Sequence, residues 1–90
     1  MNKSFNPQTF DDIEVRLDEL IAQTDTMPIS GYSDRMRGEV LNLIEKAMDI
    51  IPFDAASKMQ ADQALGLLHA GNTRLALVKL RIAIDDYLAG

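Results

Sequence analysis

Hydrophobic positions recur every three or four residues in four stretches of the chain, which is the spacing of one face of an α-helix. Glycine and proline residues separate the stretches. The pattern predicts helices over residues 9–23, 34–51, 55–70 and 73–88. We therefore expect an all-α fold, a small and mostly antiparallel four-helix bundle, in a single domain that spans residues 1–90.

The ends of the predicted helices carry residues that favour capping. Thr9, Ser33 and Asp54 each precede a predicted helix, and their side-chain oxygens can accept hydrogen bonds from the free amides of the first turn. Gly71 follows the third helix, and Asn72 precedes the fourth as its expected N-cap. Residues 70–72 therefore predict the tight turn of a C-terminal antiparallel αα-hairpin, with a positive φ at Gly71.

The apolar faces of the predicted helices differ in width. In helix 9–23 the apolar stripe is about 100° wide, which suits a helix on the outside of the bundle. In helix 34–51 apolar residues cover about half of the circumference, more than an outer helix needs. We expect this second helix to be central, together with the fourth.

The helix over residues 73–88 has two apolar faces. One face consists of Leu77, Leu80, Ala83, Ile84, Tyr87 and Leu88. The other consists of Leu75, Val78 and Ile82. A single layer of helices covers only one of these faces, so the second predicts self-association into a homo-oligomer through Leu75, Val78 and Ile82.

The amino-acid composition limits the catalytic and metal-binding chemistry that we expect of the chain. The chain has no cysteine, which excludes disulfides and thiolate metal sites and is compatible with a reducing cytoplasm. Its only histidine, His69, stands at a helix end, where a cationic side chain is favoured. The adjacent acids 11–12 and 85–86 point about 100° apart on a helix and do not converge on one ion. We expect no enzyme activity, no cofactor and no metal site.

Charge and hydropathy limit the partners and the cellular location that we expect for the protein. The net charge of −5 disfavours non-specific binding to nucleic acid and to anionic membranes. No stretch approaches the roughly 20 apolar residues of a membrane span, and residues 1–5 do not begin an apolar signal sequence. We expect a cytoplasmic protein that does not associate with membranes.

The beginning of the fourth helix is the strongest candidate for a ligand site. Asn72, Thr73 and Arg74 stand where free backbone amides favour an anion, and a guanidinium can donate two hydrogen bonds to phosphate. Lys46 and Tyr32, from a neighbouring helix or subunit, can add charge and stacking. The prediction is a small anionic ligand. In the simpler alternative, Asn72 caps the helix and Arg74 lies in solvent.

Two short segments resemble a phage family. Residues 29–32 (Ile-Ser-Gly-Tyr) and 76–81 (Ala-Leu-Val-Lys-Leu-Arg) resemble segments of the anti-CBASS cyclic-nucleotide sponges, whose helical-hairpin domain is shared with anti-Thoeris sponges. The resemblance covers residues 29–85 and implies a phage anti-defence protein in which Tyr32 stacks on a base and Lys46 contacts phosphate. The chain departs from the family at Ser33, where a basic residue is usual, and by one residue in register at Lys46. It also lacks the tryptophan of the hairpin and has an additional N-terminal helix.

Three functions stay open at this point. The first is a protein adaptor or inhibitor that acts through an apolar helical face. The second is a sponge that sequesters cyclic nucleotides at subunit interfaces. The third is an acidic nucleic-acid mimic, because the first helix is rich in carboxylates. A net charge of −5 is modest for mimicry, and we expect a non-enzymatic binding protein of the first kind.

Overall fold

The computed structural model describes residues 9–26 and 33–90, which form four α-helices. These are α1 (Phe10–Asp25), α2 (Asp34–Ile50), α3 (Ala55–His69) and α4 (Thr73–Ala89). The described residues contain no β-strand. Each helix begins and ends within two residues of the bounds predicted from the sequence. The prediction of an all-α helical bundle is therefore confirmed.

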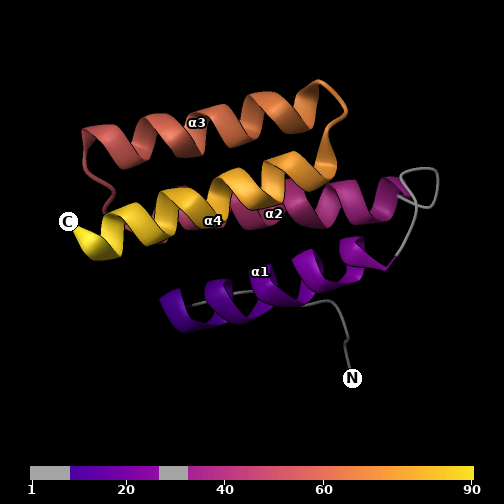
Figure 1. Cartoon of the computed structure of the whole chain (residues 1–90), viewed down its shortest axis with the longest axis horizontal. Helices are drawn as coiled ribbons and strands as arrows, with labels where there is room; N and C mark the ends of the chain where they lie inside the picture. The colour runs from indigo at the N-terminus through magenta and orange to yellow at the C-terminus, as the bar shows by residue number, and fades with distance from the viewer. Residues whose placement is uncertain (1–8, 27–32) are drawn as a thin grey trace.

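The helices are arranged around a central pair (Figure 1). Consecutive helices run in opposite directions, so α2 and α4 run in the same direction and lie next to each other. Both contact α1 on one side and α3 on the other, and the packing of α3 against α4 is the most extensive. The outer position of α1 and the central positions of α2 and α4 agree with the widths of their apolar faces.

The core lies where the four helices meet. At the contact between α3 and α4 the buried positions include four alanines, Ala61 and Ala64 on α3 and Ala76 and Ala83 on α4. Their short side chains allow the two helices to pack closely. Larger side chains fill the space between the remaining helices: Ile13, Leu17, Leu20, Val40, Leu43, Ile44, Leu77, Leu80 and Ile84.

Three of the four predicted N-caps are confirmed. Thr9, Ser33 and Asp54 each accept a hydrogen bond from the backbone N–H three residues further on, over 3.1, 3.1 and 2.8 Å. At α1 the bond is reciprocal, because the Asp12 carboxylate accepts from the backbone N–H of Thr9. These bonds satisfy amides that have no partner within the helix.

The hairpin between α3 and α4 has the predicted turn but not the predicted cap. Gly71 has a φ of 91°, its N–H donates to the Leu68 carbonyl, and the N–H of Asn72 donates to the Leu67 carbonyl, which is a Schellman motif. The Asn72 side chain makes no capping bond to α4. The turn leads directly into α4 and holds Asn72 at a ψ of 69°, whereas the other three caps are extended. The prediction of an Asn72 side-chain cap was therefore wrong.

Candidate protein-binding site

One side of α4 presents apolar side chains to solvent. Leu75 is 55% exposed and Ile82 is 41% exposed, and Val78 between them is half-buried. We call these three residues the outer face of α4. They span about two turns, or roughly 10 Å along the helix axis. The opposite side of α4 is buried in the bundle as far as Ile84, whereas Tyr87 is half-buried and Leu88 is exposed, so the first apolar face inferred from the sequence is covered except at its end and the second is open.

The flank of the outer face that lies toward α3 carries charges of both signs. Lys79 is half-buried on this side, and Asp86 lies two turns further along α4. The Asp86 carboxylate accepts a hydrogen bond of 2.7 Å from the Gln60 amide of α3. This contact fixes the position of the acidic group at the C-terminal end of the flank.

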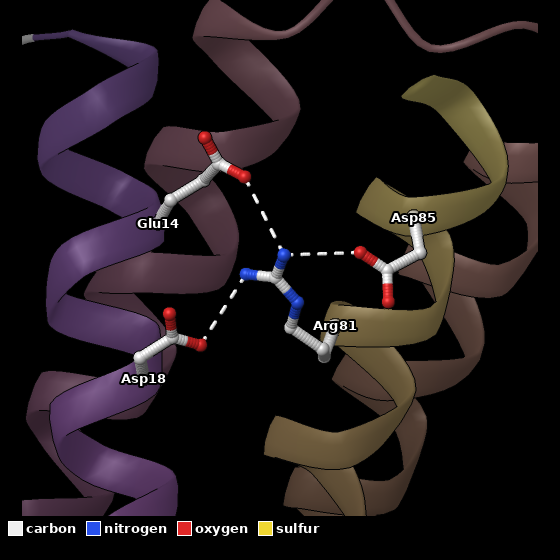
Figure 2. A network of polar contacts seen from close by, with 4 residues as sticks. All are labelled: Glu14, Asp18, Arg81 and Asp85. Carbon is white, nitrogen blue, oxygen red and sulfur yellow. Dashed lines mark hydrogen bonds and ion pairs between the residues drawn. The ribbon is translucent and has the colours of Figure 1, made fainter. Parts of the chain in front are cut away.

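The flank toward α1 is built around Arg81. Its guanidinium contacts Asp85 on the same helix at 3.0 Å, and Asp18 and Glu14 on α1 at 3.3 and 3.5 Å. Figure 2 shows the guanidinium between the two helices, with Glu14 and Asp18 on the α1 side and Asp85 on the α4 side. The Arg81 side chain is only 27% exposed, so solvent screens this network less than an open surface pair.

The charge state of Arg81 follows from its surroundings. Burial disfavours the charged form and acts to lower the pKa of Arg81, but the hydrogen bond to Asp85 and the attraction of the three carboxylates outweigh it. The pKa is therefore raised, and the guanidinium stays charged wherever the protein is folded. The network joins α1 to α4.

The residues predicted to bind an anion lie at the beginning of α4, but Arg74 is already engaged. Its Nη1 atom donates to Thr24 Oγ1 over 2.6 Å and lies 2.5 Å from Asp25 Oδ1. Thr73 is buried, with 2% of its surface exposed. Neither alternative from the sequence foresaw the contact with α1. The sequence does contain a signal for this contact, because α1 ends without a basic residue of its own and the C-terminus of a helix attracts a cation.

Of the other two predicted ligand residues, the structure describes only Lys46, which does not join this cluster. Lys46 is half-buried on α2, 12 residues from the beginning of that helix, or about 18 Å along its axis. Since α2 and α4 run in the same direction, Lys46 lies toward the opposite end of the bundle from Arg74 (Figure 1). Tyr32 lies outside the described residues.

The remaining candidate chemistry is sparse. His69 is exposed in the last turn of α3 and lines an open hollow of about 180 Å³ together with residues of α2, among them Asp34, Arg37 and Leu41. Within residues 9–26 and 33–90, no three histidine, cysteine or acidic side chains are grouped to hold a metal ion. None of the described helices is both long and apolar enough to cross a membrane.

No protein-family model matches the chain, and neither a curated protein nor a solved structure is significantly similar to it.

Proposed function

We propose that this is a non-enzymatic helical binding protein that acts through protein–protein contacts, as an adaptor or an inhibitor, and that self-associates through the outer face of α4. The observation that carries the proposal is the exposure of Leu75 and Ile82 on a helix whose opposite side is already packed. Each square ångström of apolar surface removed from water stabilises an assembly by about 25 cal/mol. Covering this face with a partner is therefore favourable.

The charges beside the outer face favour an antiparallel second copy as the occupant. On the flank toward α3, the base Lys79 lies in the first half of α4, whereas the acid Asp86 lies near its end. An antiparallel pair of α4 helices brings the basic half of each copy opposite the acidic end of the other, and a parallel pair aligns like charges. The same arrangement opposes the two helix dipoles favourably.

The test compares two exposed apolar positions. Ile82→Asp places a carboxylate in the outer face and is expected to convert a dimer into a monomer while circular dichroism stays unchanged. Met59→Asp is the matched control, because Met59 is exposed on α3 and does not belong to the outer face. Sedimentation velocity reports the oligomeric state of all three proteins.

A wild-type protein that sediments as a monomer at high micromolar concentration would contradict self-association. Dissociation by Met59→Asp to the same extent as by Ile82→Asp would show that the outer face is not the interface. Native mass spectrometry of the purified protein adds a second readout, since a co-purified nucleotide would favour a sponge instead.

A further inference from the structure

The negative charge of the chain is concentrated on α1. This helix carries six acidic residues and one basic residue, a net charge of −5 that equals the net charge of the whole chain. Bases of α4 meet its carboxylates, while its own single base, Arg16, contacts Glu39 of α2. Arg81 contacts Glu14 and Asp18, and Arg74 contacts Asp25. The two arginines are seven residues apart, so they repeat at two helical turns along the same side of α4.

Between these ion pairs α1 presents a narrow apolar stripe to the bundle. Ile13, Leu17 and Leu20 are fully buried. At its beginning, Phe10 lies against Tyr87 near the end of α4, with 6.1 Å between ring centroids. The stripe repeats every three or four residues, which is the pattern by which an amphipathic helix docks on a helical surface.

The side of the bundle that receives α1 thus combines an apolar strip with an arginine edge. We name it the α1-binding face, formed by α2 and α4 with Arg74 and Arg81 at its margin. We infer that this face is a docking site for an acidic amphipathic helix, which α1 occupies from within its own chain and from which a helix of the same chemistry in another protein displaces it.

Three features make α1 an exchangeable occupant. It lies at the outside of the bundle and contacts only the two central helices to any extent. The Asp18 and Asp25 carboxylates, through which it contacts Arg81 and Arg74, are more than half exposed, so salt reaches and screens these two ion pairs. Elements at the edge of a domain open at lower cost than its core.

The chemistry of the face selects a protein helix as the partner. Nucleic acid also carries negative charge, but its phosphates have no counterpart to the apolar side chains at positions 13, 17 and 20. A peptide with the sequence of residues 9–26 is therefore the probe. This inference concerns a different side of α4 from the outer face and does not depend on self-association.

The experiment weakens the internal occupant and leaves the receiving face intact. In the full chain, Glu14→Gln combined with Asp18→Asn removes both α1 partners of Arg81. We expect this double variant to bind the labelled peptide about tenfold more tightly than the wild type in fluorescence anisotropy, because a larger fraction of its faces is open. Glu45→Gln combined with Asp62→Asn removes the same charge from exposed positions on α2 and α3 and should leave peptide affinity at the wild-type value.

Further variants and probes distinguish docking of the peptide on the α1-binding face from non-specific electrostatic attraction. Adding Arg81→Gln to the double variant should abolish the gain, and Ile82→Asp should leave peptide binding unchanged. Equal binding of a scrambled peptide, or of single-stranded DNA of similar charge, would overturn the inference. So would peptide affinity that is the same in the double variant and the wild type. Hydrogen exchange gives an independent result: α1 amides must exchange faster than those of α4 in the double variant, and equal rates would refute an exchangeable α1.

Discussion

Arg74 and Asp25 join the beginning of α4 to the end of α1, with 2.5 Å between Nη1 of the arginine and Oδ1 of the aspartate. The same nitrogen donates to the hydroxyl of Thr24. The C-terminal end of a helix is negative, and the sequence of α1 provides no base there. Arg74 supplies from α4 the cation that α1 lacks, so its first role is to hold two helices together.

Replacing Arg74 therefore tests a contact between helices. Arg74→Met keeps an apolar stem and removes the charge, and it should lower the free energy of unfolding by about 0.5–1 kcal/mol, a modest loss because both partners are partly exposed. Arg37→Met is the control. Arg37 lies as far as 4.0 Å from Asp34 of its own helix, so Arg37→Met should leave the free energy of unfolding almost unchanged. Urea denaturation measures the free energy of unfolding of both variants. Equal losses of stability would contradict the role of Arg74 in joining α1 to α4.

Local sequence accounts for most of the fold. Helix positions follow from the three-to-four-residue spacing of apolar residues, and the caps at Thr9, Ser33 and Asp54 follow from residue type alone. Asn72 shows where residue type fails, because the preceding turn sets its backbone and the side chain does not reach the helix amides. A cap is a joint property of the residue and of the chain direction on either side of it.

The candidate surfaces were only partly predictable. The outer face appears in the sequence as a second apolar stripe on the fourth helix, while self-association through it stays a prediction. The bonds of Arg74 to Thr24 and of Arg81 to Glu14 join residues 50 and 67 positions apart. The periodicity of apolar residues predicts which face of each helix is buried. It does not predict which polar side chains of two different helices contact each other. Such contacts depend on how the helices are placed around each other.

The hairpin offers a test of backbone conformation. Gly71→Val should lower stability by about 1–2 kcal/mol, since a β-branched residue is disfavoured at the φ of 91° found there. Outside the two neighbouring residues, no described atom lies within 4 Å of a Cβ added at this position, so the expected loss comes from the backbone conformation and not from a clash of the Cβ. Gly66→Ala has equally open surroundings but a helical backbone, and it should raise stability by about 0.5–1 kcal/mol. Thermal melts shifted in the same direction by both changes would contradict this interpretation.

The cap of α3 should make stability depend on pH in the acid range. The bond from the Ser57 backbone N–H lowers the pKa of the Asp54 carboxyl in the folded protein. Its stabilisation is therefore complete above the unfolded pKa of about 3.9 and is lost as pH falls through the lower folded pKa. Asp54→Asn keeps an oxygen acceptor without the charge. The difference in unfolding free energy between wild type and variant should be constant near neutral pH and shrink in acid, and urea titrations that give the same difference at every pH would exclude this role.

The contribution of the Arg81 network to the free energy of unfolding should be lost in an Arg81 variant, and the size of this loss should depend on salt. Arg81→Met removes the only base among Glu14, Asp18 and Asp85, and the three carboxylates then repel one another across the α1–α4 contact. We expect a loss of about 1–2 kcal/mol at low ionic strength, more than for an exposed pair because Arg81 is largely shielded from solvent. Added sodium chloride screens the repulsion, so the loss should become smaller at high salt.

An exposed ion pair on α3 provides the comparison for this last experiment. Lys58 lies 3.4 Å from Asp62 one turn along the same helix, and more than half of each side chain is exposed. Lys58→Met should therefore cost less than about 0.5 kcal/mol, with little change between low and high salt. Guanidinium would itself screen the charges, so urea unfolding at two salt concentrations is the suitable measurement. If Arg81→Met and Lys58→Met lose the same stability and show the same salt response, the contact between α1 and α4 does not depend on Arg81, and apolar packing along Ile13, Leu17 and Leu20 holds α1 in place.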